Sequence, residues 1–120
     1  MARQNRQDNK APSHLREPTA RWWESVLEDF LLDPHHVRLL TMAAGAWDRA
    51  QEAGEAIAEH GLTYVDRHGS PRARPECAVE RDNKVLFARL IRELKLDLAE
   101  PPGTSLPRGS AYGPQLKGAM

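Results

Sequence analysis

Histidine, cysteine and arginine are the residues of this 120-residue sequence whose types could do chemistry. Of the five histidines, His35 and His36 are adjacent, and the others, His14, His60 and His68, are scattered. No H-E-x-x-H, H-x-x-x-H or paired-cysteine spacing of a metal site occurs. Because successive side chains on a helix point about 100° apart, adjacent histidines rarely chelate one ion. The sequence therefore predicts exposed histidines at a helix start and no metal site.

Cys77 is the single cysteine, so an internal disulfide is excluded and a reducing compartment is indicated. It falls in the first turn of an expected helix, where a thiolate is stabilised, but no base stands near it in the sequence. A small half-buried residue is the favoured interpretation over a nucleophile. No phosphate-binding glycine loop, G-x-S-x-G motif or paired-carboxylate arrangement is present. We expect no enzymatic activity, no catalytic residue and no cofactor.

The basic residues form two groups although the formal net charge is zero. Arg67, Arg72 and Arg74 lie in "EHGLTYVDRHGSPRARPE" (59–76), and they could bind phosphate bidentately or keep an exposed edge from aggregating. The second group lines one face of the third expected helix, as a solvated surface or as a site for phosphates or an acidic neighbour. The predicted DNA contacts are, in order, Arg67, Arg72, Arg74, Arg81, Lys84, Arg89, Arg92 and Lys95, followed by the N-terminal Arg3, Arg6 and Lys10.

Three helices are expected to position these residues. "ARWWESVLEDFLL" carries a broad apolar stripe after Thr19, the expected N-cap of the first helix. Asp33 and Pro34 predict the start of a second helix over 34–60, which Gly61 ends. This helix is rich in Ala and Gly, which lets another helix come close. Pro75 opens the third helix, with Val79, Leu86, Phe87, Leu90, Ile91 and Leu94 on one face.

The segment 62–74 between the second and third helices predicts a β-hairpin. "LTYV" alternates, with Leu62 and Tyr64 on one side, and Gly69 supplies the positive φ of a turn. Pro71 fits only an edge or a strand start. Since an isolated hairpin is marginally stable, it is expected to pack on the helices or to pair with a neighbouring chain.

Composition bounds the organisation of the chain. The sequence predicts a flexible basic tail over 1–17, one mainly α-helical domain over 18–98, and a flexible Pro/Gly/Ser-rich tail over 99–120. No apolar run is long enough to span a membrane, and the basic N-terminus lacks the apolar stretch of a secretory signal.

The ordered set of features over residues 20–98 resembles the small terminase subunits of tailed bacteriophages, in the branch without an obvious N-terminal helix-turn-helix. The matching features are Trp47 in "AAGAWDRAQEA", "GLTY" at 61–64, Gly69, "RP" at 74–75, and Leu86, Leu90 and Leu94. Two features depart from the family pattern. "RPECA" stands where members often have Asn-Pro-Ala, and "LKLDLAEPPGTS" replaces a Gly-Leu-Thr-Pro-like stop.

The resemblance implies a non-catalytic packaging factor that assembles as a homo-oligomeric ring. It would bind double-stranded DNA at the packaging site and recruit the large ATPase-nuclease subunit, in the cytoplasm of the infected bacterial host. The residues expected to hold the ring together are Trp47, Gly54, Ile57, Tyr64, Leu86 and Leu90. A small helical adaptor or antitoxin-like regulator acting on protein alone is the alternative. A small metal-dependent nuclease would need a set of His and acidic ligands that the sequence does not assemble.

Overall fold

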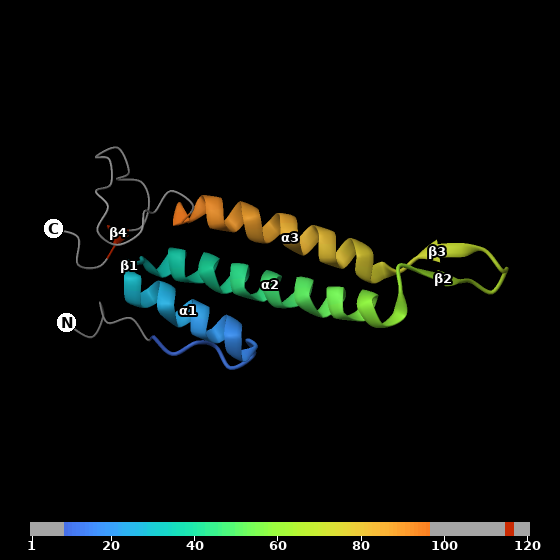
Figure 1. Ribbon diagram of the computed structural model, residues 1–120. Coiled ribbons are helices and arrows are strands. Elements are labelled where there is room, and N and C mark those ends of the chain that lie inside the picture. The colour runs from blue at the N-terminus through green and yellow to red at the C-terminus, as the bar shows by residue number, and fades with distance from the viewer. Residues whose placement is uncertain (1–8, 97–114, 117–120) are drawn as a thin grey trace.

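The computed structural model describes residues 9–96 and 115–116 as three helices and two short two-stranded sheets (Figure 1). The elements in chain order are α1 (Glu17–Asp29), β1 (Phe30–Leu31), α2 (Pro34–His60), β2 (Thr63–Val65), β3 (Pro71–Ala73), α3 (Pro75–Glu93) and β4 (Gln115–Leu116). The prediction of a mainly helical fold, with a hairpin between the second and third helices, is confirmed.

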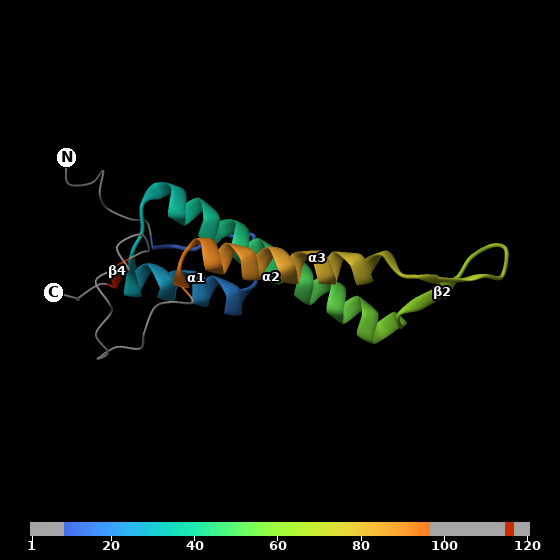
Figure 2. The same ribbon diagram turned by 90° about the horizontal axis from the view of Figure 1, so that it is seen from above.

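The molecule is elongated around α2. This helix has 27 residues, about 40 Å at 1.5 Å per residue, and α1 and α3 both run antiparallel to it (Figure 1). The β2–β3 hairpin, which we call the arm (residues 62–74), extends past the helix ends in both views (Figures 1 and 2). The radius of gyration is 18.4 Å, against about 13 Å for a compact domain of 100 residues.

Proline and glycine set the helix ends where the sequence predicts them. Pro34 and Pro75 open α2 and α3, where the missing N–H has no helical partner to lose. Gly61 ends α2 with a φ of 88°, a left-handed value that favours glycine. Asp33 is the N-cap of α2, but its carboxylate makes no capping hydrogen bond.

The predicted N-cap of α1 is wrong. The helix begins at Glu17, with Arg16 as N-cap, so Thr19 lies inside its first turn. Pro18 is tolerated as the second residue of the helix, because its fixed φ is helical and no hydrogen bond is lost in the first turn. The Thr19 hydroxyl donates instead to Asp48 Oδ1 of α2 at 2.6 Å. The Thr19 side chain, which was expected to cap α1, therefore makes a contact between α1 and α2 instead.

Residues 9–16 differ from the flexible tail expected over 1–17, because they pack against α1 and α2. Leu15 is buried in the core. The Arg16 amide donates to Asp48 Oδ2 at 2.9 Å, and its guanidinium binds Glu55 through two hydrogen bonds of 2.8 and 2.9 Å. This pairing lowers the pKa of Glu55. The rest of the expected tail, including Arg3 and Arg6, lies outside the described residues.

The main core lies at the end of the molecule away from the arm. It joins the segment before α1, α1 itself, the first half of α2 and the turn after α3; its members are Leu15, Trp23, Val26, Leu27, Leu32, Leu40, Ala44 and Leu94. Toward the arm, the buried residues of α2 are alanines and Asp48, and Gly54 faces the Glu80 carboxylate of α3. The arm end of the α2–α3 pair is therefore held by small side chains.

The end of α3 and the C-terminal segment also differ from expectation. The helix stops at Glu93, and Lys95 follows it with a left-handed φ of 62°, so Lys95 is not on the basic face of α3. Leu94 is the C-cap residue of α3 and is fully buried, so the helix ends where this side chain enters the core. Within the expected tail 99–120, Gln115 and Leu116 pair antiparallel with β1, and the other residues of that tail lie outside the described ones. Within the described part, no helix is apolar enough over a sufficient length to cross a membrane.

Candidate functional site

The arm is an ordered hairpin whose loop is organised by one carboxylate. β2 and β3 pair through Thr63–Ala73, Tyr64–Arg72 and Val65–Pro71. In the loop, Asp66 Oδ1 accepts hydrogen bonds from the His68 and Ser70 amides, both 2.9 Å, and Oδ2 accepts one from Arg72 Nε at 2.9 Å. The Ser70 amide and the Arg72 side chain are the main causes that lower the pKa of Asp66. Sequence reasoning found the glycine turn but did not single out Asp66.

The arm projects beyond the helices (Figures 1 and 2), and every residue of β2 and β3 is exposed. Of the two expected outcomes, packing on the helices of its own chain does not occur. The arm is tied to α3 only at its base, where the Arg74 amide donates to the Leu62 carbonyl at 2.9 Å. Cys77 Sγ lies 3.6 Å from the same carbonyl, and the side chain is half-buried, as expected. Two exposed edges and both faces of the arm are therefore open.

The three arginines of the arm occupy different environments. Arg67 lies in the loop, is exposed and pairs with no acidic side chain among the described residues. Arg72 forms an ion pair with Asp66, so part of its hydrogen-bonding capacity serves the loop. Arg74 is the N-cap residue of α3 and is half-buried, with an Nε that has no partner in the described part of the chain. Arg67 is the arginine best presented to an outside anion.

The basic face expected on α3 is partly neutralised. Arg81 pairs with Asp82 at 3.2 Å and Lys84 with Glu80 at 3.3 Å. Arg89 and Arg92 are exposed and have no acidic partner among the described residues. Since α3 carries four basic and four acidic residues, it has no net charge of its own. Some of the predicted DNA-binding residues therefore have no acidic partner among the described residues, and others already form ion pairs within the chain.

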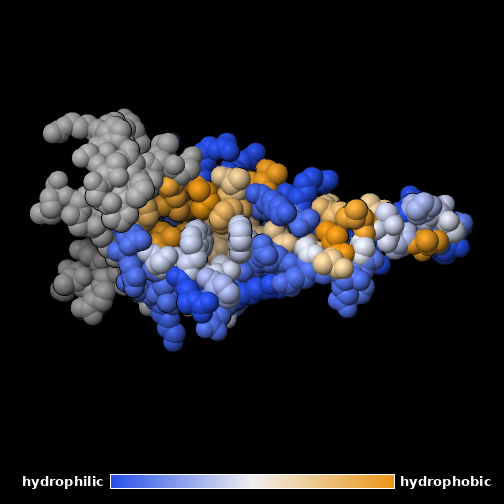
Figure 3. Space-filling view, viewed as in Figure 1, coloured by the Kyte–Doolittle hydropathy of each residue, from blue (hydrophilic) through white to orange (hydrophobic). Residues whose placement is uncertain are grey.

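A second surface is apolar. Among the described residues, the large hydrophobic side chains that stay exposed are Leu31, Met42, Trp47, Leu62, Tyr64, Val65, Val79 and Val85. Figure 3 shows apolar side chains on the helical body and again near the tip of the molecule. Phe87 of α3 links α1 to α2 through two tilted ring contacts, at 5.9 Å to Trp22 and 5.1 Å to Trp47. Trp47 nevertheless stays 43% exposed.

The residues predicted to hold a ring together fare differently in the structure. Trp47 and Tyr64 are exposed, and Ile57 and Leu86 are half-buried, so all four have surface to offer a partner. Leu90 is only 6% exposed, because α3 buries it within its own chain, so it has little surface to offer a partner. Gly54 is half-buried against Glu80 of the same chain, so its small size already serves the α2–α3 contact.

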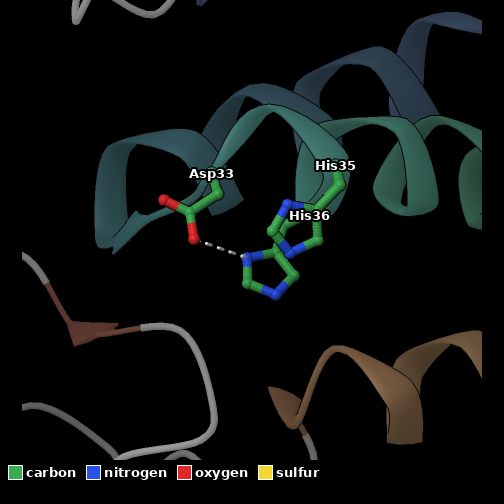
Figure 4. A group of neighbouring side chains, drawn as sticks. All are labelled: Asp33, His35 and His36. Atoms are coloured by element: carbon green, nitrogen blue, oxygen red, sulfur yellow. Dashed lines mark ion pairs between the residues drawn. The ribbon is translucent and has the colours of Figure 1, made fainter.

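The start of α2 brings together three side chains that sequence reasoning kept apart. Asp33, His35 and His36 place one ligand atom each within 4.8 Å of one another (Figure 4). The two imidazole rings are 4.2 Å apart between centroids and tilted by 43°. The expectation of diverging adjacent histidines rested on backbone direction alone. Side-chain rotamers, which the sequence does not reveal, bring the rings into contact.

Comparisons with protein-family models, with curated proteins and with solved structures give no match for this chain.

Proposed function

We propose that this protein is a non-catalytic DNA-packaging subunit of the small-terminase type, which self-associates and presents its arm to double-stranded DNA. The observation that carries the proposal is the arm itself. A two-stranded element with three arginines and one aspartate, whose strand residues are all exposed, projects from between α2 and α3. Its place in the order of elements is the one that the resemblance describes. In this proposal a large ATPase-nuclease subunit supplies the chemistry.

The arrangement of charges supports contact with phosphates at a few points rather than bulk attraction. Arg67 at the tip and Arg89 and Arg92 on α3 are exposed and free of acidic partners among the described residues. Exposed guanidiniums of this kind suit bidentate phosphate binding. A chain with zero net charge binds DNA weakly as a monomer. Several copies joined in a ring would present several arms, and multivalency raises the overall affinity.

A salt titration of DNA binding tests the proposal. We expect Arg67→Ala, and more strongly the Arg67→Ala/Arg89→Ala/Arg92→Ala variant, to weaken binding to all sequences. Each lost phosphate contact should reduce the log–log salt slope by about 0.9. These residues are exposed and unpaired, so the fold should be intact. Arg72 is left unchanged because its side chain pairs with Asp66 in the loop, and Arg74 because it is the half-buried N-cap residue of α3.

The matched control is Arg21→Ala. Arg21 is 65% exposed but pairs with Glu17 on α1, outside the predicted DNA contacts. Its replacement should leave the slope unchanged. An unchanged slope in the triple variant, with native mass spectrometry showing the same assembly as wild type, would remove the arm and α3 from DNA binding.

One observation favours the alternative of an adaptor or antitoxin-like regulator that binds protein alone. The charges of α3 balance, while large apolar side chains are exposed on α2, α3 and the arm. Such a surface suits a protein partner better than a phosphate backbone. Wild-type protein that shows no salt-dependent retention on DNA, yet has the native mass of an oligomer or complex, would select this alternative.

A further inference from the structure

The first turn of α2 holds a convergent set of metal-ligating side chains that has no part in the proposed DNA contact. Asp33 is the N-cap residue and His35 and His36 are in the first turn, yet their ligand atoms all lie within 4.8 Å of one another. Figure 4 shows the three side chains turned toward a common space. Successive helix positions point about 100° apart. The rotamers, not the backbone, produce this convergence.

Two of the three groups lack the partners that such groups normally have. An aspartate at an N-cap usually accepts a hydrogen bond from the helix amides, but Asp33 makes no such bond. His36 Nδ1 is buried and has no hydrogen-bond partner among the described residues. Buried polar atoms without partners are rare and costly. Both atoms are therefore available to a ligand in the same place.

We propose that Asp33, His35 and His36 bind a divalent transition-metal ion such as Zn²⁺. Asp33 Oδ2 and His36 Nδ1 are 3.9 Å apart, too far for a hydrogen bond. Two ligand atoms of a tetrahedral site with bonds of 2.0–2.1 Å lie about 3.3–3.4 Å apart, so a small rotation of the exposed Asp33 side chain is needed to close the set around an ion. Two imidazoles and one carboxylate suit Zn²⁺, Co²⁺ or Ni²⁺, whereas Mg²⁺ and Ca²⁺ prefer oxygen ligands alone.

The exposure of the three side chains fits this role. Asp33 and His35 are exposed and can rotate to close the ligand set around an ion, while the His36 side chain is 20% exposed and fixes the position. Three protein ligands leave at least one coordination position for water or for a group from another molecule. The positive end of the α2 dipole opposes a cation here, so the carboxylate of Asp33 is needed to offset it.

Metal titration of untagged, full-length protein without DNA tests the site. We expect calorimetry to show saturable binding of one Zn²⁺ per chain, and Co²⁺ to give the visible absorption of a low-coordinate complex. Mg²⁺ should not compete. His35→Gln, His36→Gln and Asp33→Asn should each lower the affinity by roughly tenfold to a hundredfold, the range for disturbed metal sites. His35 is exposed, so its replacement keeps the test valid even if His36→Gln perturbs the fold.

The matched control is His60→Gln. His60 lies at the other end of α2, with Nε2 3.7 Å from Glu59 Oε2, but no third ligand among the described residues completes a set there. Its loss should leave Zn²⁺ affinity unchanged. Absence of saturable Zn²⁺ binding would overturn the proposal. Equal affinity in wild type and in the His35→Gln and Asp33→Asn variants would also overturn it. The cluster would then be only a contact between the two imidazole rings next to the Asp33 carboxylate. Because DNA is not involved, neither outcome bears on the packaging proposal.

Discussion

At the scale of single residues, the most consequential side chain is a buried acid that the sequence did not mark. Asp48 is 1% exposed within the Ala-rich part of α2. It accepts hydrogen bonds from the Thr19 hydroxyl and the Arg16 amide, and so holds α1 and the preceding segment to α2. An acid in a helix normally indicates the solvent side. Its burial depends on partners 29 and 32 residues away, which periodicity does not reveal.

We predict that Asp48→Ala lowers the free energy of unfolding by about 3 kcal/mol, because it leaves the buried Thr19 hydroxyl and the partly buried Arg16 amide without an acceptor. Urea denaturation followed by circular dichroism measures this loss. The control is Glu52→Ala, four residues along the same helix, where an exposed acid pairs with Arg49 at 2.7 Å and lies 4.0 Å from the Arg16 guanidinium. That change should cost no more than about 0.5 kcal/mol. Equal stability of the two variants would show that Asp48 does not hold the segment.

At the scale of elements, the sequence correctly predicted those helix ends and turns that the backbone preferences of single residues determine. Pro34, Gly61, Gly69 and Pro75 restrict or permit backbone angles by themselves, so α2, the hairpin turn and the start of α3 lie where expected. Elements that depend on distant contacts were missed. The packing of residues 9–16, the early end of α3 and the β1–β4 pairing each require a partner remote in sequence.

The same division applies to the candidate site. The arm and its arginines could be placed from local signals, and the resemblance rests on those same signals. The pairing of Arg81 and Lys84 with acids follows from spacings of one and four residues, yet which cations stay free depends on the rotamers chosen. The contact between His35 and His36 is likewise a matter of rotamers. The sequence therefore indicated which residues could act, but not which are engaged.

The arm gives a prediction about pH. The pKa of Asp66 is lowered from its ordinary value of 3.8, so the stabilisation of the loop is complete above that value and is lost as the pH falls through the lower, folded value. We expect the NMR signal of the Ser70 amide to be constant from neutral pH down to about pH 4 and to shift below it.

Asp66→Asn is the matched variant, since it keeps one acceptor oxygen and removes the charge. Its Ser70 amide should show no such transition, and the arm should be less ordered at neutral pH. The helical circular dichroism should stay at the wild-type level, because the arm is tied to the helices only at its base. An identical acid transition in the variant would assign it to another group.

At the scale of the whole molecule, the distribution of apolar surface is uneven. The described residues include thirteen buried hydrophobic side chains, five of them alanines, while eight large ones are exposed. The chain extends over 64 × 30 × 22 Å, with its main core at one end and an uncovered arm at the other. A two-stranded hairpin is marginally stable alone. Self-association through the arm would cover Leu62, Tyr64 and Val65, which are part of the surface that this fold leaves open.

We therefore predict that replacing Leu62 and Tyr64, on one side of the arm, by serine weakens self-association. The exposed fractions of the two side chains are 64% and 41%, so little packing within the chain is lost. Burial of a large apolar side chain is worth about 1.5–3 kcal/mol, and the dissociation constant should rise at least tenfold, equivalent to about 1.4 kcal/mol.

Val85→Ser is the control, because Val85 is 56% exposed on α3 but outside the predicted interface. Native mass spectrometry across a dilution series compares the three proteins. Wild type that is monomeric at micromolar concentration, or an arm variant that dissociates no more readily than Val85→Ser, would exclude the arm as an assembly element and leave contact with DNA as its remaining proposed role.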